Sequence, residues 1–148
     1  KPSESHIYAS IDHIVEYATT TLGFSFDQII LFGISLGSGP STYMASQFPF
    51  RGLILQSPFS SVVKTRVSPY FYNMFREMDV FLNYRFMPHA QCKVAFIHGT
   101  SDALVPFSCT ETLFHLLPPK HQCPIYSVYN AGHNDIIEKS TLSFYVSQ

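Results

Sequence analysis

The chain has 148 residues, enough for one domain with a buried core. Nine lysines and arginines stand against ten aspartates and glutamates, so the net charge of −1 gives no reason to expect nucleic acid or a strongly acidic surface as a partner. The sequence shows no internal repeat, no apolar run of transmembrane length and no signal-peptide pattern.

The first predicted element is a helix over residues 5–22, followed by Gly23 as a stop signal. Its apolar residues keep to steps of three and four positions: Ile7, Ile11, Ile14, Val15, Ala18 and Leu22. The apolar run 28–32 then predicts a fully buried parallel strand. Residues 41–46 predict a helix after it, with Pro40 near the helix start, where a missing N–H costs little.

Between this strand and this helix, residues 33–37 fit the pattern G-x-S-x-G of a nucleophile elbow, with Ser35 at its centre. The turn is so tight that the residues two before and two after the serine must be very small. The serine oxygen then projects beyond the strand end, and the N–H of Leu36 faces a developing oxyanion. The run is not a phosphate loop, because it lacks the lysine of that motif and does not complete G-x-G-x-x-G.

A second strand is centred on Ile54, and the regular alternation breaks between residues 59 and 88. Three arginines lie in this segment among the aromatic residues Phe59, Tyr70, Phe71, Tyr72, Phe75, Phe81, Tyr84 and Phe86. Aromatic rings dominate cores as well as ligand pockets, so the segment fits either role.

Two further strands are centred on Ala95 and Ser127, with a helix over residues 105–117 between them and a last helix beginning near Asn134. Alternation of this kind predicts a parallel sheet with right-handed crossovers. We therefore expect an α/β fold of three layers, α-β-α, around a parallel sheet of about four strands.

Asp102 follows the strand at Ala95, and His133 follows the strand at Ser127. With Ser35 they lie beyond the carboxyl ends of predicted strands, where open α/β sheets place their sites. A serine hydroxyl is a poor nucleophile at neutral pH and needs an imidazole to take its proton. The imidazole needs a carboxylate to hold its tautomer and to stabilise the imidazolium. The three residues thus form a candidate catalytic triad in the chain order Ser, Asp, His.

Each candidate also has a plainer interpretation. Ser35 could be an ordinary serine in a glycine-rich turn, and His133 could be a core histidine, although its neighbours favour a loop. Asp102 could cap the following helix; this role is compatible with catalysis, and we expect Asp102 to have both. Asp135 is a rival acid, but it is too close in sequence to His133 to orient the ring and is expected to brace the loop or cap a helix. No metal site is predicted, because these histidines lack ligand spacing: His6, His13, His89, His98, His115 and His121.

These residues resemble the α/β-hydrolase superfamily, and within it the alpha/beta hydrolase domain-containing 17 subfamily of protein depalmitoylases. The resemblance runs nearly end to end. It includes Lys1-Pro2-Ser3-Glu4, Tyr8-Ala9-Ser10-Ile11-Asp12, Ile29-Ile30-Leu31-Phe32-Gly33, Leu53-Ile54-Leu55-Gln56-Ser57-Pro58, His98-Gly99-Thr100-Ser101-Asp102 and Gly132-His133-Asn134-Asp135-Ile136.

The resemblance implies Ser35 as nucleophile, Asp102 as acid, His133 as base and the Leu36 N–H as one oxyanion donor. It implies hydrolysis of an ester or thioester, as in depalmitoylation, on an acylated small molecule or acylated protein, with no cofactor. In hydrolases a segment at the position of 59–88 often forms a cap, so Phe59, Phe71 and Phe75 are expected to line an apolar wall for an acyl chain. The alternative is that these rings are ordinary core.

The resemblance covers the C-terminal half to two-thirds of a hydrolase domain, so residues 1–148 are expected to be one partial domain without the N-terminal strands of the full fold. Those strands carry the second oxyanion donor and pair with the elbow strand. The subfamily's lipidated N-terminal cysteine cluster is also absent, so membrane association requires a further segment. Charged residues make up only 13% of the chain, which fits a surface partly covered by the missing half or by a partner on the sheet edge.

The cysteines Cys92, Cys109 and Cys123 show no metal or redox spacing, and their odd number favours a reducing, cytoplasmic compartment. The sequence therefore predicts a serine hydrolase. Two alternatives remain: a catalytically impaired hydrolase remnant that acts as a binding or scaffold protein, and a serine peptidase of the same fold.

Overall fold

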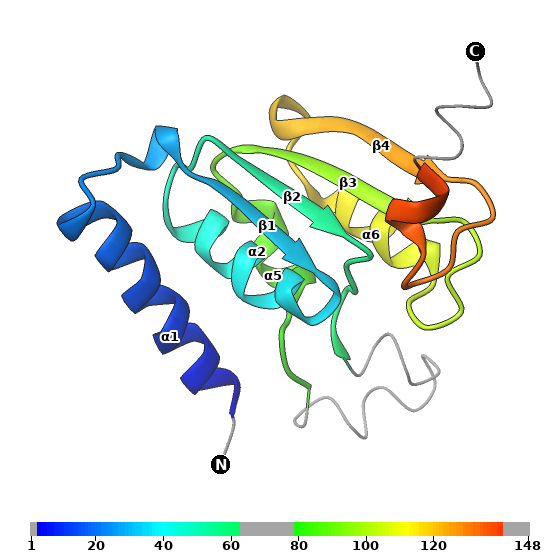
Figure 1. The fold of residues 1–148 in the computed structure, drawn as a ribbon, viewed down its shortest axis with the longest axis horizontal. Coiled ribbons are helices and arrows are strands. Elements are labelled where there is room, and N and C mark those ends of the chain that lie inside the picture. Colours follow the sequence, from blue (N-terminus) through cyan, green and yellow to red (C-terminus); the bar gives the residue numbers. More distant parts are fainter. Residues whose placement is uncertain (1–2, 63–78, 141–148) are drawn as a thin grey trace.

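Four parallel strands form a single sheet in the order β1-β2-β3-β4 in a computed structural model, which describes residues 3–62 and 79–140 (Figure 1). The strands are β1 Ile30–Ile34, β2 Gly52–Gln56, β3 Lys93–Gly99 and β4 Gln122–Val128. Each predicted strand centre lies within its strand, and the prediction of about four parallel strands is confirmed.

Helices cover the two faces of this sheet unequally. Three helices lie along one face (Figure 1): α2 Ser38–Gln47, α5 Asn83–Phe86 and α6 Phe107–Leu116. A short helix over residues 136–140 lies on the other face, where Ile136 packs against Val128, Ala131 and Ile97. Together they give the predicted three layers.

The first helix, α1 Glu4–Glu16, begins at the N-cap Ser3 and continues into a turn of π-helix at Tyr17–Thr21. The sequence predicted one regular helix through this stretch. The Thr19 hydroxyl donates to the carbonyls of Val15 and Glu16, and such back-bonding loosens the regular ladder and bends helices.

The main core lies between the sheet and the helices of the first face. Its fully buried side chains come from α2, from the inward positions of β2 and β3, and from α6 and the residue that ends it: Met44, Leu53, Leu55, Val94, Phe96, Leu113 and Leu117. Cys92 lies at the edge of this core, only 4% exposed, and burial raises the pKa of its thiol to about 11.

The prediction that the first strand is fully buried is wrong for the described residues. Leu31 faces the core and is 8% exposed, but Ile30, Phe32 and Ile34 on the other side of β1 are all about half exposed. The helix at 136–140 packs at the far edge of this face, so it leaves the outer side of β1 open. Two apolar residues of the predicted helix 5–22 are exposed as well: Ile14 in α1 and Leu22 after it.

Among residues 3–62 and 79–140, no helix has the length and apolar character needed to cross a bilayer.

Candidate active site

The turn between β1 and α2 places Ser35 at the strand end. Its backbone is left-handed, with φ of 48°, and residues Ser35–Gly37 form one turn of 3-10 helix before α2 begins. A Cβ at Gly33 would lie 2.8 Å from the carbonyl oxygen of Gly37, so only glycine fits there. A Cβ at Gly37 would meet no described atom within 4 Å. The sequence-based expectation that both glycines are sterically required therefore holds for Gly33 alone.

The Leu36 N–H lies in the first turn of this helical segment, where backbone donors have no intrahelical partner. Leu36 itself is 53% exposed, so its side chain points outward. The backbone at Leu36 is thus placed as the elbow motif requires.

Asp102 lies in the loop after β3 and is held from several directions. Its Oδ1 accepts hydrogen bonds from the N–H groups of Leu104 (2.9 Å) and Val105 (2.8 Å). Burial alone would raise the pKa of Asp102, but the hydrogen bonds from Val105, His133 and Leu104 outweigh it and lower the pKa below its ordinary value. The carboxylate therefore stays ionised near neutral pH.

The predicted capping role of Asp102 is wrong. Helix α6 begins at Phe107 with Pro106 as its N-cap, and Asp102 binds N–H groups of the preceding loop. The reason is local: a residue before proline is driven out of helical geometry, so Val105 cannot begin the helix that the sequence predicted there.

His133 lies in the loop after β4, and three contacts fix this loop. Ser101 N–H donates to the Ala131 carbonyl (2.9 Å), and Asn130 N–H donates to the Thr100 hydroxyl (2.9 Å). Asp135 accepts from the Gly132 N–H at 2.6 Å. This bracing by Asp135 was expected from the sequence.

The structure brings Ser35, His133 and Asp102 together. His133 Nδ1 lies 2.7 Å from Asp102 Oδ2, and His133 Nε2 lies 2.9 Å from Ser35 Oγ. Because the ionised carboxylate can only accept, Nδ1 carries the hydrogen and donates it. Nε2 is then free to accept from the Ser35 hydroxyl, which is the arrangement that activates a serine.

Two residues that sequence reasoning did not assign to the site also support it. His98, for which the sequence predicted no role as a metal ligand, is fully buried, and its Nε2 lies 3.3 Å from Asp102 Oδ2. Asn83 is also fully buried, and its Nδ2 donates to Ser38 Oγ (3.0 Å) and to the Phe59 carbonyl (2.9 Å). It ties the segment after β2 to the first residue of α2. The sequence signal for His98 was its place in the run His98-Gly99-Thr100-Ser101-Asp102, four residues before Asp102.

Of the residues expected to line an acyl wall, Phe71 and Phe75 lie outside the described residues. Phe59 is 5% exposed and packs in a buried cluster with Phe81, Val105 and Cys109. Val105 joins this cluster to the Asp102 loop, because its side chain packs in the cluster and its N–H donates to Asp102.

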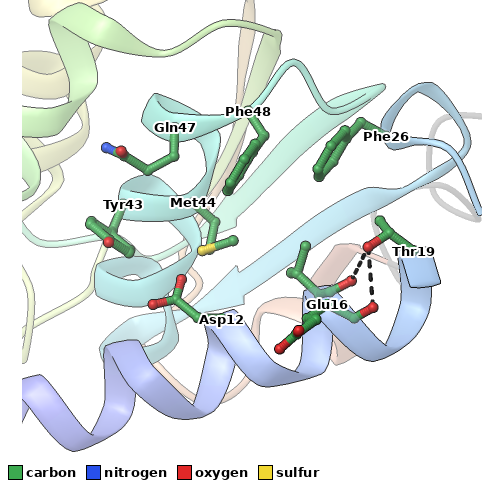
Figure 2. A pocket seen from close by; sticks show the side chains of 9 residues that line it. Asp12, Glu16, Thr19, Phe26, Tyr43, Met44, Gln47 and Phe48 are labelled. Atoms are coloured by element: carbon green, nitrogen blue, oxygen red, sulfur yellow. Dashed lines mark hydrogen bonds between the residues drawn. The ribbon is translucent and has the colours of Figure 1, made fainter. Parts of the chain in front are cut away.

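A hollow of about 460 Å³ lies elsewhere, between α1 and α2 (Figure 2). It is lined by Asp12, Val15, Glu16, Thr19, Phe26, Tyr43, Met44, Gln47 and Phe48. None of the three triad residues contributes to it. Across the described ranges 3–62 and 79–140, no cluster of three or more His, Cys, Asp or Glu side chains could hold a metal ion.

Comparison with known proteins gives both sequence relatives and structural neighbours. Alpha/beta hydrolase domain-containing protein 17C of Homo sapiens is 32% identical over 140 residues, covering 92% of this chain and 40% of that protein. The chain thus spans less than half the length of this relative. No family model matches the sequence.

Two solved structures share the fold. The monoacylglycerol lipase of Paleococcus ferrophilus superposes with a TM-score of 0.67 at 16% identity, over 99% of this chain and 76% of the lipase. MGS-MChE2, an alpha/beta hydrolase enzyme from a sediment metagenome of the lagoon of Mar Chica, gives a TM-score of 0.63 at 15% identity, over 95% and 68% of the two chains.

Proposed function

This chain has the α/β-hydrolase fold and resembles the alpha/beta hydrolase domain-containing 17 proteins in sequence, and from this premise we propose that it carries the catalytic centre of a serine hydrolase. The observation that carries the proposal is the continuous hydrogen-bonded chain from Ser35 through His133 to Asp102. The proposed reaction is hydrolysis of an ester or thioester through an acyl-enzyme.

In the first half of the reaction, Ser35 Oγ attacks the acyl carbonyl carbon, and its proton passes to His133 Nε2. Asp102 stabilises the resulting imidazolium through the 2.7 Å hydrogen bond to Nδ1. The carbonyl oxygen becomes an oxyanion, which accepts a hydrogen bond from the Leu36 N–H. Collapse of the tetrahedral intermediate breaks the bond to the leaving alcohol or thiol, which takes the proton from His133.

In the second half, a water molecule attacks the acyl-enzyme carbonyl and gives its proton to His133 Nε2. Collapse of this second intermediate releases the carboxylic acid, and the proton returns to Ser35 Oγ. Both halves use the same proton acceptor, so no group beyond the triad has to move a proton.

The acylated substrate is proposed from the sequence relationship, which favours a thioester on an acylated protein or a small acylated molecule. Phe59, Phe71 and Phe75 are the proposed apolar wall for the acyl chain, within a cap-like segment over residues 59–88. The free cysteines fit the proposed cytoplasmic location. A membrane-associated form would need a lipidated segment, and an exposed sheet edge would suit a covering partner.

A second candidate is a binding or scaffold protein built on an impaired hydrolase centre. Two observations on β1 favour it. Among the described strands β1 pairs only with β2, so its other hydrogen-bonding edge is open. Its outer face also exposes Ile30, Phe32 and Ile34. Removing one oxyanion donor costs roughly a hundred- to a thousandfold in turnover, so a chain with the Leu36 donor alone would be slow.

A fluorophosphonate probe, which labels an activated serine, separates the two candidates. We expect labelling of the wild-type chain and of Ser10→Ala, a control in which an exposed serine of α1 is removed, but not of Ser35→Ala. Equal labelling of Ser35→Ala and wild type would rule out Ser35 as the nucleophile. Turnover of p-nitrophenyl acyl esters, with none of aminoacyl anilides, would distinguish an esterase from a peptidase of the same fold.

A further inference from the structure

His98 is a buried imidazole whose contacts converge on the candidate acid. It lies in β3, one residue before the strand ends, and its side chain has no exposed surface. Its Nδ1 lies 2.7 Å from the Thr110 hydroxyl, and its Nε2 lies 3.0 Å from the Val105 carbonyl and 3.3 Å from Asp102 Oδ2. Phe107 contacts the ring edge, with centroids 5.4 Å apart. Its polar contacts and this ring contact therefore lie in the acid loop or in the first turn of α6.

The contacts fix the tautomer of His98. The Val105 carbonyl can only accept, so the hydrogen is on Nε2, which donates to this carbonyl and faces Asp102 Oδ2 at 3.3 Å. Burial lowers the pKa of His98, which keeps the ring neutral and leaves Nδ1 without a hydrogen. Nδ1 then accepts from the Thr110 hydroxyl, itself fully buried in α6. The Val105 carbonyl thus selects the tautomer, and the Thr110 hydroxyl satisfies the other ring nitrogen.

The hydrogen bonds of Asp102 show what that donor does. Oδ1 is anchored by the N–H groups of Leu104 and Val105, which leaves the carboxylate able to turn about this oxygen. Oδ2 is reached by His133 from one direction and by His98 from another. Because the His133 and His98 rings both face Oδ2, the buried His98 ring limits the turning of the carboxylate before His133 becomes charged. A carboxylate that turned would lose the direction of its bond to His133 Nδ1.

We propose that His98 is a positioning residue for the reaction, which holds the carboxylate of Asp102 in the plane that orients His133, with Thr110 holding the His98 ring in place through its Nδ1. The catalytic consequence rests on the proposed serine hydrolase function, whereas the tautomer and its contacts do not. The competing explanation is that His98 only fills space between β3 and α6.

Two substitutions of His98 separate these explanations. The amide nitrogen of a glutamine reaches close to the position of imidazole Nε2, whereas an asparagine reaches only the position of Nδ1. His98→Gln therefore keeps a donor for Asp102, and His98→Asn keeps only a partner for Thr110. For ester turnover, we expect kcat of His98→Asn to fall by up to roughly a hundredfold with KM little changed, as when a catalytic group is slightly misplaced. His98→Gln should recover a large part of this loss.

Thr110 gives a second, milder pair. Thr110→Val removes the hydroxyl that bonds to His98 Nδ1 at nearly constant volume, and Thr110→Ser keeps it. We expect kcat to fall in Thr110→Val and to stay near wild type in Thr110→Ser. Equal kcat losses in His98→Gln and His98→Asn, or an unchanged kcat in a folded His98→Asn chain, would overturn the positioning role. A Thr110→Val chain that keeps wild-type kcat would overturn the supporting role of Thr110.

Nitrogen-15 NMR of the wild-type histidine rings tests the arrangement without any turnover. We expect His98 to be neutral with a proton on Nε2 and none on Nδ1, and the His133 Nδ1 proton to resonate far downfield because it is held by Asp102. That proton signal should persist in His98→Gln and weaken or shift in His98→Asn. The opposite tautomer of His98 in a chain that the fluorophosphonate probe labels would disprove this inference alone. The expected tautomer in a chain that the probe does not label would instead count against the proposed function alone.

Discussion

Gly99 and Ala131 lie backbone to backbone: a Cβ added at Gly99 would be 2.3 Å from the Ala131 carbonyl oxygen. Gly99 ends β3 and leads into the loop of Asp102, whereas Ala131 lies in the loop of His133. The Ser101 N–H also donates to the Ala131 carbonyl. The distance between the acid and the base is therefore set by a contact between their two loops, in addition to their own hydrogen bond.

Gly99→Ala should separate the two loops. We expect loss of probe labelling and a fall in the free energy of unfolding of about 1–3 kcal/mol or more, as for other overpacked sites. Gly52→Ala is the matched control, because a Cβ there would meet only the Lys93 carbonyl at an ordinary 3.6 Å. Labelling rates and denaturant unfolding of both variants check the prediction. A labelled, stable Gly99→Ala chain would show that the loop contact does not set the geometry.

Asp102→Asn should leave the chain folded but remove its activity. The oxygen of the amide is required by the Leu104 and Val105 N–H groups, so the amide NH₂ would face His133 Nδ1 and His98 Nε2. The amide NH₂ would then face the Nδ1–H of His133, and two donors cannot bond to each other. The His133 ring would therefore take the other tautomer, in which Nε2 carries the hydrogen and cannot take the Ser35 proton. The expected loss in kcat is roughly ten-thousandfold, the size seen when a triad histidine is held in the wrong tautomer. Steady-state kinetics and the near-ultraviolet circular dichroism of the variant measure both parts.

Gly33→Ala and Gly37→Ala form a direct test of the elbow. The first would place a methyl group 2.8 Å from the Gly37 carbonyl oxygen and 2.9 Å from Ser41 Oγ, whereas the second would meet open space. We expect Gly33→Ala to lower both thermal stability and probe labelling, and Gly37→Ala to resemble wild type in this chain. Equal damage from both substitutions would show that something outside the described residues packs beside Gly37.

The pH dependence of stability should carry the signature of His98. Burial holds its folded-state pKa below the ordinary value of 6.5, so as the pH falls through 6.5 the unfolded chain takes up a proton that the folded chain refuses. The stabilising contribution is thus complete above pH 6.5 and is lost as the pH falls toward the folded-state pKa. The free energy of unfolding should drop with a slope of up to about 1.4 kcal/mol per pH unit from this group.

His98→Gln removes this titration, so urea unfolding at a series of pH values below neutrality should give a shallower decline than in wild type. Asp102 acts at lower pH, because its lowered pKa gives stability that is present above 3.8 and is lost as the pH falls through its folded-state value. Identical slopes in wild type and His98→Gln would mean that His98 does not stay neutral when folded.

Substitutions at two neighbouring residues of β1 should lower the stability by very different amounts. Leu31→Ala empties a core position and is expected to cost about 2–5 kcal/mol of unfolding free energy. Phe32→Thr changes a half-exposed position with a residue suited to strands and should cost no more than about 1 kcal/mol. Denaturant unfolding at two protein concentrations measures both. A large cost for Phe32→Thr would show that the outer side of β1 is covered in solution.

The strands and the meeting of Ser35, Asp102 and His133 could be predicted because they depend on short-range rules. Apolar runs predict strands, and the order of three side chains after strand ends predicts that they share one edge of a parallel sheet. The start of β1 was predicted two residues early because Gln28 caps a 3-10 turn: its side chain accepts from the Ser25 N–H. An apolar pattern contains no information on such a local competitor.

Other features depend on contacts between distant segments and could not be predicted. The run 28–32 shows that a strand can be buried on both sides, but not whether a second layer reaches it. The contact of His98 with Asp102 needs the curvature of the loop after β3, which Pro106 and the Leu104 and Val105 N–H groups decide together. The packing of Asn83 on Ser38 joins positions 45 residues apart through a segment without a regular pattern.

The buried thiol of Cys92 can report transient opening of the folded chain. With ionisation delayed to about pH 11 and its surface almost closed to solvent, this thiol should react with an alkylating reagent only in the moments when the sheet opens. Cys123, half-buried in β4, should be alkylated faster and serves as the internal reference. The ratio of the two alkylation rates would time how often the interior becomes accessible, with no label added to the protein.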